Sequence, residues 1–247
     1  MRFDVITLFE PMFAAVTENG ITSRAMQRGL WSLYTWNPRE ETEDNHRTVD
    51  DRPFGGGPGM VMMAEPLART VRRIRRSGNV GRVVSFAPNG TRLTDETVRR
   101  WVAEDRDMVL ICGRYEGIDQ RFLDNYVDET VSVGDFVLSG GELAAMVLID
   151  AVVRQLPGAI KELSTLDESF STGLLDAPHY TRPEVWEGQA VPEVLLSGHH
   201  ANIAKWTREQ ALELTLRTRA DLIEKAKANG KLSETDRLWL KKHGYPV

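Results

Sequence analysis

Short apolar runs alternate with helix-like segments over the first 157 residues of this 247-residue chain. The apolar runs indicate strands at 3–8, 33–36, 82–86, 108–112 and 126–131, and the segments between them indicate helices at 10–29, 64–76, 94–103 and 142–154. Strands and helices that alternate across short loops are typical of a mostly parallel sheet covered by helices. The sequence therefore predicts an α/β fold for this part of the chain.

The chain changes character after Pro157. Residues 158–172 are small and polar, as in a linker or a functional lid. Helices are predicted beyond them at 203–216, 219–228 and 233–242, with Asn229 and Gly230 as a stop signal and a small core of Trp206, Leu212, Leu216 and Leu222. We expect a sheet domain at 1–160, a linker or lid at 161–175 and a small all-helical domain at 176–247.

Composition excludes several classes of protein. The one cysteine, Cys112, rules out a disulfide framework and fits a reducing cytoplasm, and the five histidines show no metal-ligand spacing. No apolar stretch is long enough to span a membrane, and the first six residues indicate a strand rather than a signal peptide. We therefore expect a cytoplasmic protein with no membrane partner and no structural metal site.

The net charge of −5 is unevenly distributed along the chain. Residues 201–247 hold ten Lys and Arg against six Asp and Glu, so this tail carries +4 and residues 1–200 carry −9. A mildly basic helical tail is compatible with contacts to RNA phosphates, although a solvated helix face is the commoner reason for such a pattern.

A glycine-rich segment at 132–142, Ser-Val-Gly-Asp-Phe-Val-Leu-Ser-Gly-Gly-Glu, joins a predicted strand to the apolar helix that ends at Arg154. Glycines let backbone amides and carbonyls approach a ligand with no Cβ between them. The segment lacks the Lys and Ser/Thr of a phosphate-binding P-loop and does not match G-x-G-x-x-G. It is therefore predicted to surround a polar, largely uncharged group such as an adenine or a ribose.

Two further loops follow predicted strands. The loop 113–119 comes after the strand at 108–112, and the turn 87–90 comes after the strand at 82–86. Ligands bind outside the carboxyl ends of the strands in open α/β sheets. Three loops at the same edge of the sheet therefore predict a ligand site.

Five motifs occur in a fixed order along the chain: 50–61 (Asp-Asp-Arg-Pro-Phe-Gly-Gly-Gly-Pro-Gly-Met-Val), 112–119 (Cys-Gly-Arg-Tyr-Glu-Gly-Ile-Asp), 132–142, 178–183 (Pro-His-Tyr-Thr-Arg-Pro) and 191–198 (Val-Pro-Glu-Val-Leu-Leu-Ser-Gly). In this order they resemble the bacterial tRNA (guanine-N1)-methyltransferases, which modify the guanine directly 3′ of the anticodon. The resemblance runs from about Met1 to Arg219. It implies a SPOUT-type fold with a C-terminal trefoil knot in the sheet domain, a homodimer, S-adenosyl-L-methionine as methyl donor, the tRNA anticodon stem-loop as partner, and a role for Mg²⁺.

The resemblance also assigns residues to the site. The predicted cofactor-binding residues lie in the three loops and are Ala87, Pro88, Gly113, Tyr115, Glu116, Val133, Gly134, Asp135, Phe136, Val137, Leu138, Gly140 and Gly141. The predicted substrate-binding residues are Arg114, Ser169, His179 and Arg182.

Methylation at N1 of guanine needs a base that removes the N1 proton and a cation that stabilises the charge developing at O6. The family carries the cation as an arginine on the helix after the knot loop, which matches Arg154. It carries the base as an aspartate directly before Ser-Phe in the interdomain linker, where this chain has Glu168, with Asp167 one position earlier. Glu168 and Asp167 are therefore the two candidates for the base.

Two alternatives to guanine N1 methylation are compatible with the same residues. The chain could be a SPOUT methyltransferase that acts on another RNA atom, such as a ribose 2′-hydroxyl. It could also be a cofactor- and RNA-binding variant whose catalysis is impaired, because the linker aspartate of the family is replaced here.

Overall fold

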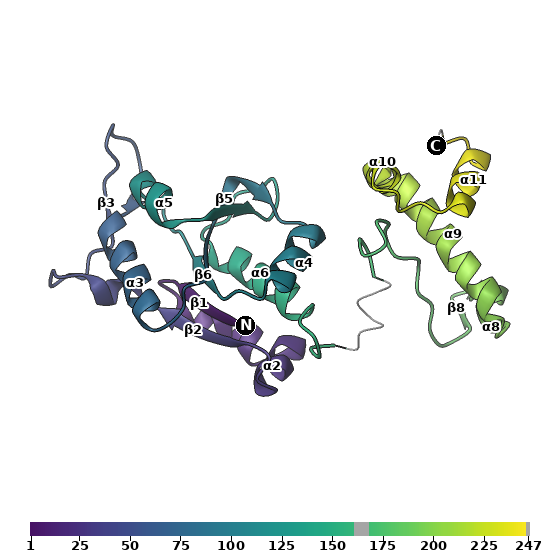
Figure 1. The fold of residues 1–247 in the computed structure, drawn as a ribbon, viewed down its shortest axis with the longest axis horizontal. Coiled ribbons are helices and arrows are strands. Elements are labelled where there is room, and N and C mark those ends of the chain that lie inside the picture. The colour runs from purple at the N-terminus through teal and green to yellow at the C-terminus, as the bar shows by residue number, and fades with distance from the viewer. Residues whose placement is uncertain (161–167, 246–247) are drawn as a thin grey trace. The chain divides into compact units, whose positions relative to one another are not determined.

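The computed structural model describes residues 1–160 and 168–245, and the chain divides into two compact units, Met1–Lys161 and Glu162–Val247 (Figure 1). The first unit contains a central sheet with helices around it, and the second is mainly helical. None of the helices in the described part of the chain is long and apolar enough to cross a membrane.

The first unit is built on a five-stranded sheet in which all neighbouring strands run parallel. The strand order is β2-β1-β6-β5-β7. The strands are β1 (Arg2–Ile6), β2 (Ser32–Trp36), β5 (Arg82–Arg92), β6 (Met108–Ile111) and β7 (Glu129–Ser132). The prediction of an α/β fold with a mostly parallel sheet is confirmed.

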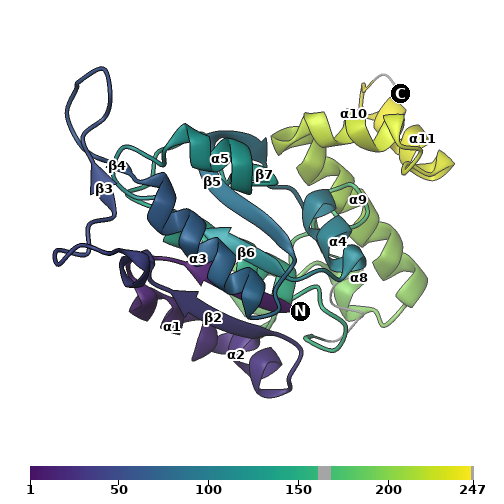
Figure 2. The same ribbon diagram turned by 60° about the vertical axis from the view of Figure 1, so that its left-hand side comes forward.

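Helices cover both faces of this sheet (Figure 2). One face carries the short 3-10 helix η1 (Glu10–Phe13), α1 (Ala14–Thr17), α2 (Gly20–Gln27), α4 (Asp95–Glu104) and α6 (Glu142–Val153), and the other carries α3 (Ala64–Arg76) and α5 (Gln120–Tyr126), with the 3-10 helix η2 (Pro38–Glu41) against α3. Strand β6 shows why both faces are covered: Met108 and Leu110 belong to the core under α6, whereas Val109 and Ile111 belong to the core under α3. A strand that is apolar on both faces must be buried on both, as is typical of parallel sheets.

Helix α3 has the predicted bounds, and its arginines form a solvated face. Arg69 pairs with Glu65 and Glu43, and Arg73 pairs with Glu40 and Glu41 of η2. Its apolar side chains, including Leu67 and Ile74, are buried against the sheet. Carboxylates of the same unit therefore pair with three of its arginines, Arg69, Arg72 and Arg73.

Strand β5 is longer than predicted. The predicted turn at 87–90 lies inside a strand that continues to Arg92, and Phe86 and Thr91 are both opposite Val131 of β7. The four residues between them therefore form a bulge rather than the end of the strand. Gly90 allows this, because a Cβ at that position would lie 2.6 Å from the backbone of Val131.

Helix α5 replaces the beginning of a predicted strand. The sequence indicated a strand at 126–131, but Tyr126 ends α5 and β7 begins at Glu129. Asp119 caps the helix by accepting a hydrogen bond from the amide of Arg121 at 2.9 Å. The rings of Phe122 and Tyr126 then stack on one face, with centroids 5.3 Å apart. An N-cap and an i, i+4 aromatic pair are helix signals that outweighed the apolar run.

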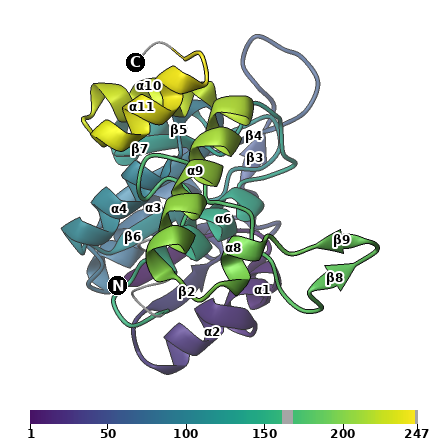
Figure 3. The ribbon, with the colours of Figure 1, turned by 90° about the vertical axis from the view of Figure 1, so that its right-hand side faces the viewer.

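The second unit contains a short hairpin and four helices in its described residues (Figure 3). These are β8 (Val185–Trp186), β9 (Gln189–Ala190), α8 (Glu193–Leu196), α9 (His200–Thr218), α10 (Ala220–Ala228) and α11 (Glu234–Lys242). The hairpin was not predicted. Leu212 lies in the core as expected, but Trp206 is only partly buried and faces Tyr180 instead, at 6.2 Å between ring centroids.

Candidate functional site

A cavity of about 330 Å³ lies in the first unit, where the segments that follow β6 and β7 meet the bulge of β5. Its volume is within the range of small-molecule and cofactor sites. Twelve of the thirteen residues predicted to bind a cofactor line it, and the exception is Asp135. The parallel sheet thus brings three segments that are distant in the sequence to one place.

Asp135 lies outside the lining because its side chain is turned to solvent. The carboxylate is 91% exposed and 3.8 Å from the guanidinium of Arg92. Its neighbours Gly134 and Phe136 both line the cavity. The backbone therefore passes along the cavity while this one side chain points away, which sequence position alone does not reveal.

The glycines of the site allow backbones to approach one another closely. A Cβ on Gly141 would lie 2.8 Å from Cα of Cys112, and the Gly141 amide donates to the carbonyl of Gly113 at 2.9 Å. A Cβ on Gly140 would collide with the side chain of Arg114. The first turn of α6 thus packs directly on the segment after β6, so that both can line the same cavity.

A buried ion pair joins the elements around this cavity. Arg114 Nε lies 2.9 Å from Glu142 Oε2, and the other Glu142 oxygen accepts a hydrogen bond from Thr7 Oγ1 at 2.9 Å. The Glu142 residue is 0% exposed. Although close, Arg114 Nε and Glu142 Oε2 are not aligned as a hydrogen bond. The pair connects β1, β6 and α6, and a buried charge of this kind depends on its partner.

Arg114 was predicted to bind substrate, and its guanidinium makes several contacts within its own unit. Nη1 donates to the carbonyl of Ser139 at 3.2 Å, and the group lies 4.2 Å from the centroid of the Phe9 ring. Arg114 also lines the cavity. In this structure it positions the 132–141 segment, and its role toward a substrate stays a prediction.

Tyr115 has a left-handed backbone, with φ of 58°, which is uncommon for a residue other than glycine. Its hydroxyl receives a hydrogen bond from Arg39 at 3.4 Å. Burial raises the pKa of Tyr115 above its usual value, and a hydrogen bond to Asp50 raises it further. The side chain is therefore a neutral phenol at the mouth of the cavity, held by residues of a different segment.

Cys112 is the residue before this loop, and it is buried. Burial raises the pKa of the Cys112 thiol well above its ordinary value, and the negative charge of Glu142 adds to this effect. The thiol is therefore neutral at physiological pH and is not a nucleophile. Cys112 fills space in the core beneath the site.

Several lining residues were not predicted as site residues. They are mostly small or polar and include Ser85, Asn89, Gly117, Ser132, Ser139 and Ala144. Ala144 and Ser139 lie within or next to the glycine-rich segment, and their small side chains were the available signal. Ser85 gave no local signal, because its position at the cavity follows from the register of β5 and β7.

Only some of the predicted linker residues are among the described residues. Asp167 lies outside the described residues, so only Glu168 of the two candidate bases can be located. Glu168 is half-buried, and its carbonyl accepts hydrogen bonds from the amide and hydroxyl of Ser171 at 3.2 and 2.6 Å. Phe170 follows with a φ of 74°. Glu168 is therefore part of a tight turn at the beginning of the described second unit.

Two of the predicted substrate-binding residues, Ser169 and His179, both contact Asp176, one through its backbone amide and the other through its carboxylate. Ser169 Oγ accepts a hydrogen bond from the amide of Asp176 at 3.0 Å, and Asp176 Oδ2 lies 3.0 Å from His179 Nε2. The imidazole of His179 is 83% exposed. Arg182 is exposed and is not part of this cluster. The second unit thus presents a polar group formed by Ser169, Asp176 and His179.

Arg154 ends α6 in the first unit. It is the C-cap of the helix, and its amide donates to the carbonyls of Asp150 and Val152. A cation at a helix C-terminus complements the helix dipole. The side chain is half-buried, so the helix places it at a defined position.

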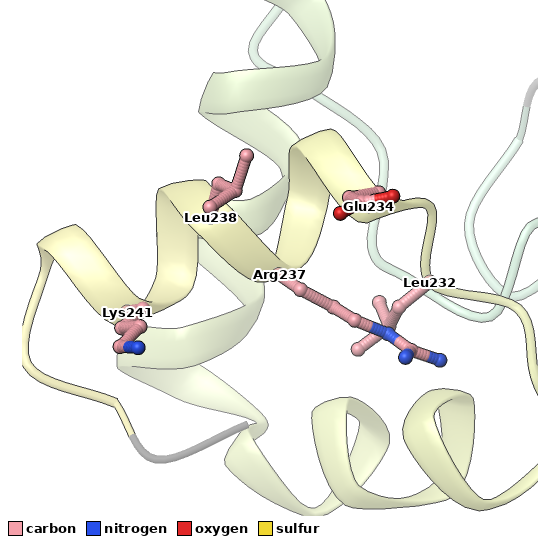
Figure 4. Close-up of a pocket in the computed structure, with 5 residues that line it drawn as sticks. All are labelled: Leu232, Glu234, Arg237, Leu238 and Lys241. Carbon is pink, nitrogen blue, oxygen red and sulfur yellow. The ribbon is translucent and has the colours of Figure 1, made fainter.

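The second unit has a hollow of its own, of about 440 Å³, on α11 and the segment before it (Figure 4). It is lined by Leu232, Glu234, Arg237, Leu238 and Lys241, and all of these except Leu232 are exposed. Its lining contains no glycines that would expose backbone groups to a ligand, and we assign it no ligand.

Among residues 1–160 and 168–245, no three His, Cys, Asp or Glu side chains come close enough to hold a metal ion.

Comparison with known proteins identifies relatives of this chain. The family described as tRNA (Guanine-1)-methyltransferase TrmD matches residues 1–225. A tRNA (guanine-N(1)-)-methyltransferase of Herminiimonas arsenicoxydans is 56% identical, over 97% of this chain and 99% of the relative. Enzymes with the same name from Janthinobacterium sp. (strain Marseille) and Burkholderia mallei (strain SAVP1) are each 55% identical, over 97% of this chain and 98% and 93% of their own lengths.

Proposed function

The chain belongs to the tRNA (guanine-1)-methyltransferase family, and from this we propose that it transfers a methyl group from S-adenosyl-L-methionine to N1 of the guanine directly 3′ of the anticodon in tRNA. The observation that carries the proposal is the glycine-lined cavity formed by the segments at 87–90, 113–117 and 132–141. Ten of its 23 lining residues are glycine, alanine or serine, which leaves backbone amides and carbonyls within reach of a ligand, and the larger residues are mostly apolar. Because tRNA is the substrate, we expect the enzyme in the cytoplasm.

The residues of the cavity suit an adenosine-containing cofactor. Five glycines of the segments 113–117 and 132–141 line it, and Tyr115 and Phe136 add aromatic surface. When bound, S-adenosyl-L-methionine supplies a methyl group that its sulfonium has already activated. The protein supplies orientation, which recovers roughly 7–11 kcal/mol of the barrier in well-oriented reactions. The role of Mg²⁺ rests on the family alone and stays a prediction.

Two side chains act on the guanine in this proposal. Glu168, or Asp167 beside it, removes the proton from N1. Arg154 stabilises the negative charge that develops at O6. In support of these roles, hydrogen bonds hold both backbones in place: Glu168 begins a tight turn, and Arg154 is the C-cap of α6. Ser169, His179, Arg182 and Arg114 are proposed to contact the tRNA.

We propose that the active enzyme is a homodimer with a trefoil knot in each first unit. Helix α6 supports the dimer, because it is apolar on more than one side. Ala145 and Ile149 are buried inside the unit, whereas Leu143 and Val147 are 48% and 52% exposed. Two apolar side chains one turn apart on an exposed helix face are typical of an interface. In this arrangement the knot loop of one subunit faces the linker and helical unit of the other.

The dimer can be tested at Val147. Val147→Asp should yield a monomer at micromolar concentration, since an unpaired carboxylate is costly to bury in an apolar interface. Sedimentation velocity measures the outcome. Val80→Asp is the matched control, because Val80 is 75% exposed on the loop after α3 and should leave the dimer intact. A Val147→Asp protein that stays dimeric would contradict the proposed interface.

The cofactor site can be tested at Ala144. Ala144→Leu adds bulk to the wall of the cavity, and overpacking of this kind costs about 1–3 kcal/mol. The affinity for S-adenosyl-L-methionine should therefore fall between about 5-fold and about 150-fold in titration calorimetry. Ala201→Leu, at an exposed position of α9, should leave the affinity unchanged. Equal affinity in a folded Ala144→Leu protein would show that the cofactor binds elsewhere.

One experiment separates the proposed function from its alternatives. The protein is incubated with labelled S-adenosyl-L-methionine and an anticodon stem-loop RNA, and the modified nucleoside is then identified. We expect 1-methylguanosine. A 2′-O-methyl nucleoside would instead favour a methyltransferase for another RNA atom, and RNA binding without methyl transfer would favour the catalytically impaired variant.

A further inference from the structure

The connection between β3 (Asp50–Asp51) and β4 (Val61–Met62) is a loop that projects from the first unit (Figure 2). Phe54 is 100% exposed. Arg52 beside it is also exposed and has no ion-pair partner among residues 1–160 and 168–245. Neither side chain stabilises the fold through packing, so the loop presents both to the solvent.

The base of this loop is fixed to the segment that lines the cofactor cavity. The amide of Glu116 donates to the carbonyl of Met60, and the amide of Met62 donates to the carbonyl of Gly117, both at 2.9 Å. A Cβ on Gly59 would collide with the Glu116 side chain. Two residues of the cavity wall, Glu116 and Gly117, are thus bound directly to the loop that carries Phe54.

The glycines of the loop are needed for its backbone conformation and not for close packing. Gly55, Gly56 and Gly57 have φ of 90°, 77° and 112°, and a Cβ on any of them would meet nothing within 4 Å. They therefore allow a left-handed path that other residues rarely adopt. The result is a projecting tip that exposes one ring, on a loop whose base is bound to the cavity wall.

From this placement we propose that Phe54 stacks on an unpaired base next to the target guanine, while Arg52 contacts a backbone phosphate. This proposal deepens the proposed function and rests on it. The target lies in a single-stranded loop, where bases are splayed out and stacked on aromatic side chains. Such stacking tolerates any base, because every base has a π-face, and an adjacent arginine adds charge attraction to the phosphate. Phe54 is therefore a substrate-positioning residue.

The test uses anticodon stem-loop RNA in which 2-aminopurine replaces each nucleotide flanking the target guanine in turn. The unaltered enzyme should quench the fluorescence of one of these positions as the base stacks on Phe54. Phe54→Ala should remove this quenching and weaken RNA binding between about 5-fold and about 150-fold, the range for loss of one stacked base. The defect should appear mainly in KM.

Three controls test whether the effect is specific to the aromatic ring of Phe54. Phe54→Trp should restore stacking, and affinity for S-adenosyl-L-methionine should be the same in all variants. Val80→Ala, which removes another exposed apolar side chain, should leave RNA binding unchanged.

Equal RNA affinity and quenching in Phe54→Ala would overturn the stacking role. Dissociation of the Phe54→Ala dimer in sedimentation would also overturn it, because the ring would then contact a second copy of the chain. Absence of methyl transfer by the unaltered enzyme would instead reject the proposed function, so the two failures are distinguishable.

Discussion

Replacing Glu168 by glutamine should lower the single-turnover rate of methyl transfer by on the order of 10²–10⁴, the usual contribution of a general base. Glutamine preserves the size of the side chain but cannot accept the N1 proton. The Glu168 carbonyl and its hydrogen bonds from Ser171 should be unaffected, since they involve only the backbone of residue 168. Affinity for S-adenosyl-L-methionine should therefore change little, which calorimetry on the same preparation checks.

Asp167→Asn is the matched control for this experiment. It removes one carboxylate from the adjacent position and should cost much less activity if Glu168 is the base. A severe defect in Asp167→Asn beside near-normal Glu168→Gln would place the base one residue earlier. Activity that survives both substitutions would mean that the proton is taken by another group.

Arg154→Ala should slow methyl transfer independently of the base. It should raise the activation barrier by about 2.7–4 kcal/mol, the cost of removing one donor to a developing anion in other enzymes.

Replacing Glu142 by alanine should destabilise the protein by about 3–5 kcal/mol, because it leaves the mostly buried Arg114 without its partner. The pair is well isolated from solvent: the side chains of Arg114 and Glu142 are 17% and 1% exposed. Thr7 would also lose the carboxylate that accepts its hydroxyl. Urea unfolding followed by circular dichroism measures the change in the free energy of unfolding.

Two further proteins make the Glu142 measurement specific. Glu96→Ala removes an exposed carboxylate from the first turn of α4, and it controls for the loss of a negative charge at a helix N-terminus. It should cost well under about 1 kcal/mol. The double variant Glu142→Leu with Arg114→Met should be less destabilised than Glu142→Ala, since apolar replacements leave no unpaired charge. A Glu142→Ala cost equal to that of Glu96→Ala would show that the buried pair contributes nothing to stability.

Local features of the sequence were sufficient for most elements of the first unit. The bounds of α3 follow from apolar periodicity, and those of α6 follow from a continuous apolar run after the glycine-rich segment. The cap on α4 follows from Thr94, whose side chain accepts a hydrogen bond from the Thr97 amide at 3.3 Å. These signals involve residues within one or two helical turns of each other, so they can be recognised in the sequence without knowledge of the fold. The cavity at this edge of the sheet was also predictable, because parallel strands bring their carboxyl ends to one edge.

The two errors in the predicted strands have different origins, and the first lies in pairing between distant segments. The length of β5 depends on how closely Gly90 approaches Val131 of β7, and the residues next to Gly90 in the sequence give no sign of that contact. The apolar run at 126–131 was compatible with a strand or a helix over its first residues. The Asp119 cap and the Phe122–Tyr126 ring pair favour the helix there, and packing of α5 against α3 adds to them.

The sequence by itself determined the α/β class, the positions of the main helices and the three segments of the cavity, because periodicity, caps and glycines act locally. Only the tertiary structure decided which side chains meet there. Arg114, predicted to bind substrate, pairs with Glu142, and Asp135 turns to solvent between two residues that line the cavity. These outcomes depend on sheet register and on burial of charge, which join residues far apart in the chain and so have no local signature.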